Sequence, residues 1–193
     1  MTQAEASPAL YTPAWLETQA YTKPWVERAL LAVFAQFGLP GAMLDLGCGT
    51  GYAVRLAQKL GVMADGIDIA LQPYGDVFLS AGDLTKPLPP ANWLRDLVLC
   101  WETAEHIAPA GTKVFLDNVV TATDKLLIFT AARPGQGGEG HINCRSKGYW
   151  RRELERRGLV YQPDETKHLR ETWRWCTGPA FWYPANVQVF RRP

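Results

Sequence analysis

The stretch MLDLGCGTGYA, residues 43–53, contains the strongest indication of the fold of this chain. A short apolar run ends at Asp45, and Gly47, Gly49 and Gly51 then alternate with small residues before a helical pattern starts. Glycines at such positions let a loop bring its backbone N–H groups, and the N-terminus of the next helix, close to a ligand. The stretch therefore predicts a strand, a ligand-binding loop and a helix in succession.

Segments with strand and helix patterns alternate on both sides of this loop. Apolar runs predict strands at Ala42–Leu46, Val62–Ile67, Asp76–Ser80, Arg95–Cys100, Lys125–Thr130, Leu159–Tyr161 and Asn186–Phe190. Helical spacing predicts helices at Pro24–Phe37, Tyr52–Leu60, Lys113–Thr121 and Lys147–Arg157. Such alternation predicts an α/β fold in which helices cover both faces of a parallel, doubly wound sheet.

The composition sets limits on the class of protein. The 193 residues, 47% of them hydrophobic, suffice for one core and favour a single globular unit. Lys and Arg number 20 against 19 for Asp and Glu, and this balance argues against sequence-specific binding of nucleic acid. The apolar runs are too short to cross a bilayer, so no membrane span is expected.

The first residues and the cysteines bear on the cellular compartment. The segment MTQAEASPAL lacks the basic stretch and apolar core that are typical of a signal peptide. The four cysteines are scattered without a CxxC pair, which argues against a zinc knuckle and against a disulfide framework. A reducing cytoplasm fits this pattern best. The sequence leaves the oligomeric state open.

Two classes of nucleotide cofactor bind at a glycine loop of this kind. The dinucleotide fingerprint G-x-G-x-x-G/A needs a small third residue, but Tyr52 stands at that position. Asp45 would also repel a pyrophosphate, whereas S-adenosylmethionine (SAM) carries an ammonium and a sulfonium and no phosphate. The loop therefore favours SAM, and an NAD(P)-dependent oxidoreductase is the alternative enzyme class.

The segment LDLGCGTG resembles the first motif of class I SAM-dependent methyltransferases. Further segments are similar to later parts of that family: ADGIDIA (64–70), AGDLTKPLP (81–89), LVLCWETAEHI (97–107), GHINCRSKGYWRRELERRGL (140–159) and FWYPANVQVFRR (181–192). The resemblance implies a Rossmann-like sheet of seven strands, mostly parallel with an antiparallel last strand. It implies a methyltransferase domain at residues 41–193, preceded by an N-terminal arm and helix at residues 1–40.

The same resemblance implies the residues that bind the cofactor. The glycine loop would approach the methionine part of SAM, and Asp45 would face its ammonium. Asp68 would accept both ribose hydroxyls, Asp83 would accept the adenine amino group, and Cys100 would offer its backbone carbonyl. The full set of cofactor-binding candidates is Asp45, Gly47, Cys48, Gly49, Gly51, Asp68, Ile69, Asp83, Leu84 and Cys100.

Two carboxylates and an imidazole follow the fourth predicted strand, at Glu102, Glu105 and His106, and they allow three interpretations. In the first, these residues and His141 bind Mg²⁺ or Mn²⁺, because ExxEH resembles the ligand cluster of metal-dependent methyltransferases. In the second, His106 or His141 acts as a general base without a metal. In the third, the acidic residues only favour a helix N-terminus. The catalytic candidates are thus His106, Glu105 and His141.

Either chemical interpretation favours transfer of a methyl group to a hydroxyl oxygen, because a hydroxyl gains more from a base or a metal than an amine does. A small-molecule acceptor is expected, which the aromatic segment 168–184 could contact. Arg145 and Lys147 could hold a phosphate or a carboxylate. The aromatic residues of the arm at positions 11, 15 and 21 would form either a lid or ordinary core packing. The non-enzyme alternative is a catalytically inactive SAM-binding domain.

Overall fold

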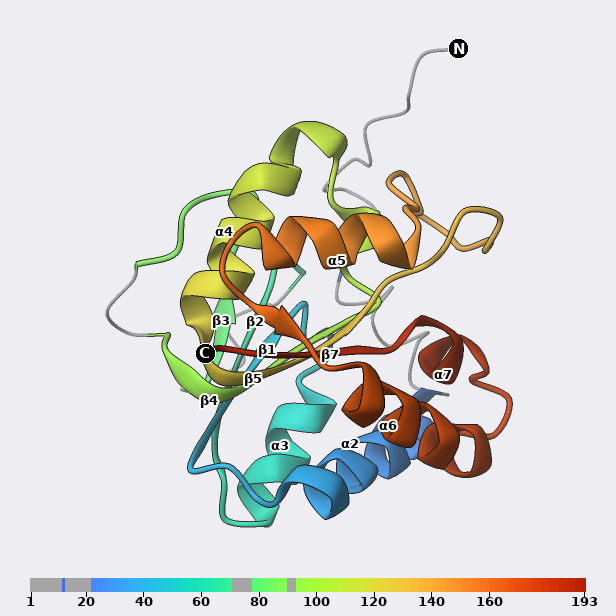
Figure 1. Ribbon diagram of the computed structural model, residues 1–193. Coiled ribbons are helices and arrows are strands. Elements are labelled where there is room, and N and C mark those ends of the chain that lie inside the picture. Colours follow the sequence, from blue (N-terminus) through green and yellow to red (C-terminus); the bar gives the residue numbers. More distant parts are fainter. Residues whose placement is uncertain (1–11, 13–21, 71–77, 90–92) are drawn as a thin grey trace.

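The strands of the computed structural model form one seven-stranded sheet, in the order β3-β2-β1-β4-β5-β7-β6 (Figure 1). The structure describes residues 12, 22–70, 78–89 and 93–193. The strands are β1 (Ala42–Leu46), β2 (Met63–Asp68), β3 (Leu79–Ala81), β4 (Arg95–Trp101), β5 (Thr123–Thr130), β6 (Val160–Tyr161) and β7 (Gln188–Arg191). Neighbouring strands from β3 to β5 are parallel, and β7 is antiparallel to both β5 and β6. The predicted Rossmann-like sheet, with its antiparallel last strand, is confirmed.

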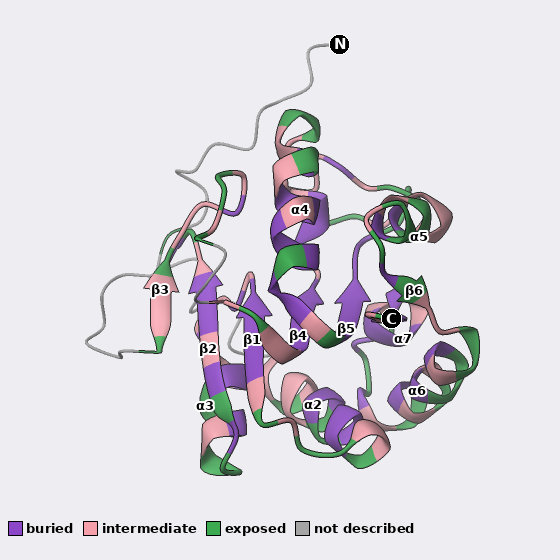
Figure 2. Ribbon diagram, turned by 60° about the vertical axis from the view of Figure 1, so that its left-hand side comes forward, coloured by how far each residue is buried: buried purple, intermediate pink, exposed green. Residues whose placement is uncertain are grey.

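Helices cover both faces of this sheet (Figure 2). The helices are α2 (Lys23–Phe37), α3 (Tyr52–Lys59), α4 (Thr112–Ala122), α5 (Lys147–Glu155), α6 (Pro163–Cys176) and α7 (Trp182–Asn186), with short 3-10 turns η4 (Ala104–His106) and η5 (Pro109–Gly111). One face is covered by α2, α3 and α6, and the other by α4 and α5. Of the described helices, none is both long and apolar enough to cross a membrane.

The strands send alternate side chains into two separate cores. In β4, Leu97 and Leu99 belong to the core that α2, α3 and α6 cover, whereas Val98 and Cys100 belong to the core under α4 and α5. Side chains of a strand alternate between the faces of a sheet, so a strand covered on both faces reads as a continuous apolar run. This explains why the run at 97–100 shows no polar alternation although it is a strand.

Two helices of the C-terminal part differ from the sequence-based expectation. Residues 163–176 form α6, for which no helix was predicted, and residues 182–186 form α7, so that the last strand starts at Gln188 instead of Asn186. Pro163 opens α6 at its first turn, and Leu169 and Trp173 bury one face of it. The helical spacing of Leu169 and Trp173 is therefore present in the sequence, in a segment whose aromatic residues also fit an acceptor pocket. The predicted third strand begins in residues 71–77, outside the described part.

Candidate functional site

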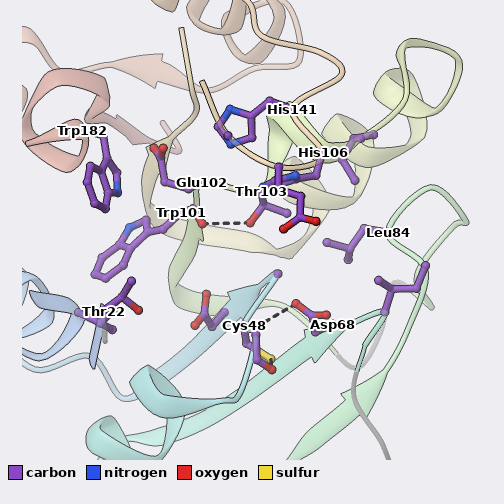
Figure 3. Close-up of a pocket in the computed structure, with 18 of the residues that line it drawn as sticks. Thr22, Cys48, Asp68, Leu84, Trp101, Glu102, Thr103, His106, His141 and Trp182 are labelled. Carbon is purple, nitrogen blue, oxygen red and sulfur yellow. Dashed lines mark hydrogen bonds between the residues drawn. The ribbon is translucent and has the colours of Figure 1, made fainter. Parts of the chain in front are cut away.

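A cleft of about 1490 Å³ opens at the edge of the sheet where the parallel strands end (Figure 3). Loops that follow β1, β2, β3, β4 and β5 line it, together with the start of α2 and residues of α7. The strand order reverses between the neighbouring strands β1 and β4, because β2 and β3 lie on one side of β1 and β4 and β5 lie on the other. Open α/β sheets bind their ligands at such a switch point. The cleft is therefore the first candidate for a ligand site.

The glycine loop after β1 is shaped by its contact with Thr103. Gly47 has φ 81°, and a Cβ on it would lie 2.5 Å from Thr103 Cγ2 and closer still to Thr103 Oγ1. The Thr103 hydroxyl is 3.2 Å from the carbonyl oxygens of Leu46 and Trp101, to which it donates. Glycine is thus required at position 47 both by the backbone conformation and by the side chain that packs against it. Sequence reasoning missed Thr103, because nothing in its local pattern marks it.

Asp68 ends β2 and faces the glycine loop. Its carboxylate accepts hydrogen bonds from the backbone N–H of Gly49 at 2.9 Å and of Ala70 at 2.8 Å. Burial raises the pKa of Asp68, and the two N–H groups counteract that rise. A carboxylate has about four acceptor positions, so hydroxyl groups of a ligand in the cleft can be accepted as well.

Asp45 lies at the floor of the cleft and is 6% exposed. Burial, with a further contribution from the charge of Asp68, raises the pKa of Asp45 to about 7. Near neutral pH this carboxyl group is therefore close to half-ionised. A cation placed in the cleft would favour the charged form. The floor of the cleft is thus suited to a ligand that carries positive charge.

The other cofactor-binding candidates fall into two groups. Cys48, Ile69, Asp83 and Leu84 line the cleft. Asp83 also accepts hydrogen bonds within its own turn, from the backbone N–H and hydroxyl of Thr85 at 2.8 and 2.6 Å.

Gly51 and Cys100 are not among the described residues that line the cleft. Gly51 has φ 73° at the start of α3, and a Cβ on it would lie 2.6 Å from the Leu79 side chain. Its role is therefore to let the chain enter the helix while it packs against β3. Cys100 is fully buried, and its side chain packs in the core beneath α4 and α5.

Glu102 has an unusual backbone conformation, with φ 49°. Its N–H donates to Thr130, 3.1 Å from the carbonyl oxygen and 2.9 Å from the hydroxyl. Its carboxylate accepts from the side-chain amides of Gln136 and Asn186, each at 3.0 Å. These amides are 34 and 84 residues away along the chain, so no local spacing could have revealed them. The Glu102 carboxylate is thus held by hydrogen bonds from two side-chain amides on one wall of the cleft.

Glu105, His106 and His141 form a second cluster beside that network, with Glu105 close enough to Glu102 for the two carboxylates to interact. Their ligand atoms all lie within 4.8 Å of one another, and His141 Nε2 is 4.0 Å from Glu105 Oε1. Glu105 is fully buried, and neither carboxylate oxygen has a hydrogen-bond partner among the described residues. Burial raises the pKa of Glu105 well above its usual range, and the charge of Glu102 raises it further. A buried carboxylate of this kind is suited to a cation or a proton donor.

The two histidines have the same tautomer. Nδ1 of His106 is 3.1 Å from the carbonyl oxygen of Gly140, and Nδ1 of His141 is 3.3 Å from that of Gln136. Since a carbonyl oxygen only accepts, each Nδ1 is assigned the proton and each Nε2 the lone pair. Burial, followed by repulsion from His141, lowers the pKa of His106 to about 4, so its ring is neutral at pH 7. Figure 3 shows both rings across the cleft from Asp68.

Comparison with known proteins gives no match by sequence. No family model matches the chain, and no curated protein matches it.

Comparison of structures, in contrast, gives many matches. Magnesium protoporphyrin IX methyltransferase from Synechocystis, solved with bound SAM, has a TM-score of 0.60 and 18% identity over 89% of this chain and 79% of that one. A chain from a complex of a methyltransferase activator and a methyltransferase of Haloferax volcanii has a TM-score of 0.66 and 16% identity over 97% and 98%. A toxoflavin-precursor N1-methyltransferase from Burkholderia thailandensis, solved with S-adenosylhomocysteine, has a TM-score of 0.62 and 13% identity over 95% and 84%.

The chain has the class I methyltransferase fold.

In this methyltransferase fold the aromatic residues near the C-terminus have three different environments. Trp173 is fully buried and donates to the carbonyl oxygen of Ala29 at 3.1 Å, so it serves the core. Phe181, Trp182 and Tyr183 line the cleft, and Figure 3 shows Trp182 beside Glu102. Trp175 is 90% exposed and lies away from the cleft lining.

The beginning of α2 also contributes to the cleft of this methyltransferase fold. Thr22, Lys23 and Val26 line it. The aromatic residues at positions 11, 15 and 21, which were expected to form a lid or part of the core, lie outside the described residues. The glycine-rich loop 133–140 covers the opposite side, and a Cβ on Gly138 would overlap the ring of His141. This loop therefore packs directly on one of the candidate catalytic residues.

Proposed function

We propose that this chain is a class I SAM-dependent methyltransferase that transfers a methyl group to a hydroxyl oxygen of a small-molecule acceptor. The observation that carries the proposal is the pair of carboxylates at the floor of the cleft where β1 and β2 end, the buried Asp45 and the half-buried Asp68. Solved structures of the same fold, from Synechocystis and Burkholderia thailandensis, contain SAM or S-adenosylhomocysteine.

The residues on the cleft floor fit SAM in charge and in hydrogen bonding. The pKa of Asp45, about 7, allows this group to ionise in response to the ammonium of the cofactor. Asp68 retains acceptor capacity for the two ribose hydroxyls. Asp83 and Leu84 line the part of the cleft that would receive the adenine. SAM, when bound, supplies an electrophilic methyl group, and the chain has to place an acceptor atom in line with it.

The acceptor side of the cleft indicates a small molecule with an aromatic or apolar part. Trp101, Phe181 and Trp182 line this wall and would exclude water from the bound acceptor. Proteins of the same fold are named for porphyrin, N-acetylserotonin and toxoflavin-precursor substrates, all of them small molecules.

The histidines supply the chemistry at the acceptor oxygen. The pKa of about 4 makes His106 a weak proton acceptor at neutral pH, because a general base works best when its pKa is near the working pH. The same neutral imidazole is a good metal ligand. The other imidazole of the cluster is His141, whose Nε2 is 4.0 Å from Glu105 Oε1.

The cluster of Glu105, His106 and His141 fits a divalent cation such as Mg²⁺ or Mn²⁺. The two Glu105 oxygens lack hydrogen bonds among the described residues, and a cation would compensate this buried carboxylate. Two imidazoles and one carboxylate favour Mn²⁺ over Mg²⁺, which prefers oxygen ligands. The metal would supply Lewis acidity that lowers the pKa of the acceptor hydroxyl. Glu102, already bound to two amides, is assigned to the wall of the site.

Titration with Mn²⁺ should distinguish the two glutamates. We expect Glu105→Gln to weaken Mn²⁺ binding at least about tenfold, because it removes a charged ligand. Glu102→Gln makes the same change three residues earlier and should not weaken Mn²⁺ binding, because it leaves the three ligands in place and removes a charge that raises the pKa of Glu105. Electron paramagnetic resonance of free Mn²⁺ would measure both. Equal losses in the two variants would show that Glu102 is a ligand, and no binding to the unmodified chain would exclude the metal site.

Thermal unfolding with cofactors should test the proposed function itself. SAM or S-adenosylhomocysteine at about 100 times its dissociation constant should stabilise the chain by about 2.7 kcal/mol and raise its Tm by about 5–10 °C. NADH at the same concentration should leave the Tm unchanged. A shift with NADH alone would favour the oxidoreductase. A shift with SAM, but no turnover with any hydroxyl-containing acceptor, would favour an inactive SAM-binding domain.

A further inference from the structure

A second, smaller cavity of about 170 Å³ is lined by residues of α5, α6, β6 and β7. Figure 2 shows where these four elements lie in the fold. The walls of the cavity come from the first turns of α5, from β6 and β7, and from α6. The residues that line it are Lys147, Gly148, Arg151, Tyr161, Arg170 and Gln188. None of these residues lines the large cleft. A water molecule occupies about 30 Å³ in the liquid, so the cavity has room for a group of about five heavy atoms.

Three of the six lining residues are cationic, and none of the six is acidic. Burial, followed by repulsion from Arg170, Arg133 and Arg174, lowers the pKa of Lys147. The Lys147 ammonium donates to the carbonyl oxygen of Ala185 at 3.0 Å. Within the described part of the chain, the one ion pair that these three cations make is a surface contact of 3.7 Å between Arg151 and Glu155. Positive charge in this cavity is therefore only partly compensated by the protein.

Polar groups in the cavity also lack protein partners. The Nε of Arg170 is buried without a hydrogen-bond partner in the described part of the chain. Gln188 is 3% exposed, and its side-chain amide makes no hydrogen bond to the described residues although it lines the cavity. A buried donor such as the Arg170 Nε–H is costly unless a ligand or water satisfies it.

The start of α5 adds a backbone contribution. Ser146 caps this helix by accepting from the N–H of Tyr149 at 3.2 Å. Lys147 and Gly148 form the first two positions of the helix, so their N–H groups lie at its positive end. Gly148 has no side chain to cover these groups. Helix dipole, cations and unsatisfied donors thus point to the same ligand chemistry.

We propose that this cavity is a binding site for a phosphate-type oxyanion, which Arg170, Lys147 and Gln188 contact. The group would be either the free ion or a phosphate that is carried by a larger molecule. The site does not depend on the proposed methyl transfer, because it shares no lining residue with the cleft. Lys147, one of the two cations that the sequence associates with a phosphate or a carboxylate, lies in it. Arg145 lies elsewhere, donating to Asn143 at 2.9 Å.

Thermal unfolding of the full chain with inorganic phosphate should test this site. Phosphate should raise the Tm in a saturable way, above the effect of sodium chloride at equal ionic strength and equally in saturating S-adenosylhomocysteine. Arg170→Gln should weaken phosphate binding at least about tenfold, since it removes charge-assisted hydrogen bonds. Lys167→Gln removes the same charge from an exposed position of α6 and should bind phosphate like the unmodified chain.

A second variant and a second ligand extend this test of phosphate binding. If Arg170→Gln does not fold, Lys147→Gln removes another cation of the same cavity, on α5, and its phosphate binding is measured in the same way. Glycerol 3-phosphate, which presents a phosphate monoester, shows whether the group can be carried by a larger molecule, and only free phosphate binding would assign the site to the ion. A phosphate effect no larger than that of chloride, or one that both variants retain, would overturn the proposal. Loss of the effect on addition of S-adenosylhomocysteine would place the anion in the cleft and overturn it as well.

Discussion

Asp68→Ala should abolish the binding of SAM while the fold is retained. The variant loses the proposed acceptor for the ribose hydroxyls and releases the N–H groups of Gly49 and Ala70, which Asp68 binds in the structure. Hydrogen bonds to a charged group contribute about 1.5–3 kcal/mol each, so two of them correspond to a loss of affinity of about a hundredfold or more. Calorimetric titration with S-adenosylhomocysteine measures this directly.

Asp65→Ala is the matched control for this experiment. Asp65 belongs to the same strand, β2, but pairs with Arg95 at 2.6 Å and does not line the cleft. We expect this variant to lose some stability and to bind S-adenosylhomocysteine as the unmodified chain does. Asp68→Asn should bind with intermediate affinity, because it keeps one acceptor oxygen and removes the charge. Unchanged affinity of Asp68→Ala would refute the assignment of the ribose site.

Gly47→Ala should destabilise the fold by about 2–5 kcal/mol. Position 47 has φ 81°, which costs a residue with a Cβ about 1–3 kcal/mol, and overlap with Thr103 adds an overpacking cost of similar size. Urea unfolding measures the free-energy change. Thr103→Ala in the same chain should restore part of the loss, because it removes the two closest atoms and leaves Cβ at 2.9 Å.

Gly61→Ala separates the two contributions to this loss. Gly61 has a nearly identical φ of 85°, but a Cβ there would meet nothing within 4 Å. It should therefore cost the backbone strain alone, about 1–3 kcal/mol. The difference between the two variants gives the contribution of the contact with Thr103. Equal losses would show that the glycine at 47 serves the backbone conformation only.

Most of the fold could be predicted from the sequence because it is encoded locally. The strand at Ala42–Leu46 was predicted with its observed bounds, and β4 differs from its prediction by one residue. Apolar runs bounded by glycines and acids define such strands without reference to distant residues. The helix α6 was missed although Leu169 and Trp173 have helical spacing, because the exposed Trp175 interrupts the separation of apolar and polar faces.

Much of the candidate site could also be placed from the sequence. Eight of the ten cofactor-binding candidates line the cleft, since they follow strands whose ends meet at one edge of a parallel sheet. Gly51 and Cys100 do not line the cleft, because Gly51 packs against Leu79 and the Cys100 side chain lies in the core, and the contact predicted for the Cys100 backbone carbonyl stays a prediction. A motif indicates which loop meets a ligand, but packing decides which atoms of that loop are exposed.

The sequence by itself determined the order of strands and helices, the glycine loop and the acids at the ends of β1 and β2. Only the tertiary structure decided the roles of Glu102 and Glu105, which lie three residues apart. Glu102 is held by Gln136 and Asn186, whereas Glu105 is buried beside His106 and His141. These partners come from loops far along the chain, and burial and charge, which set the chemistry of a carboxylate, depend on such long-range contacts.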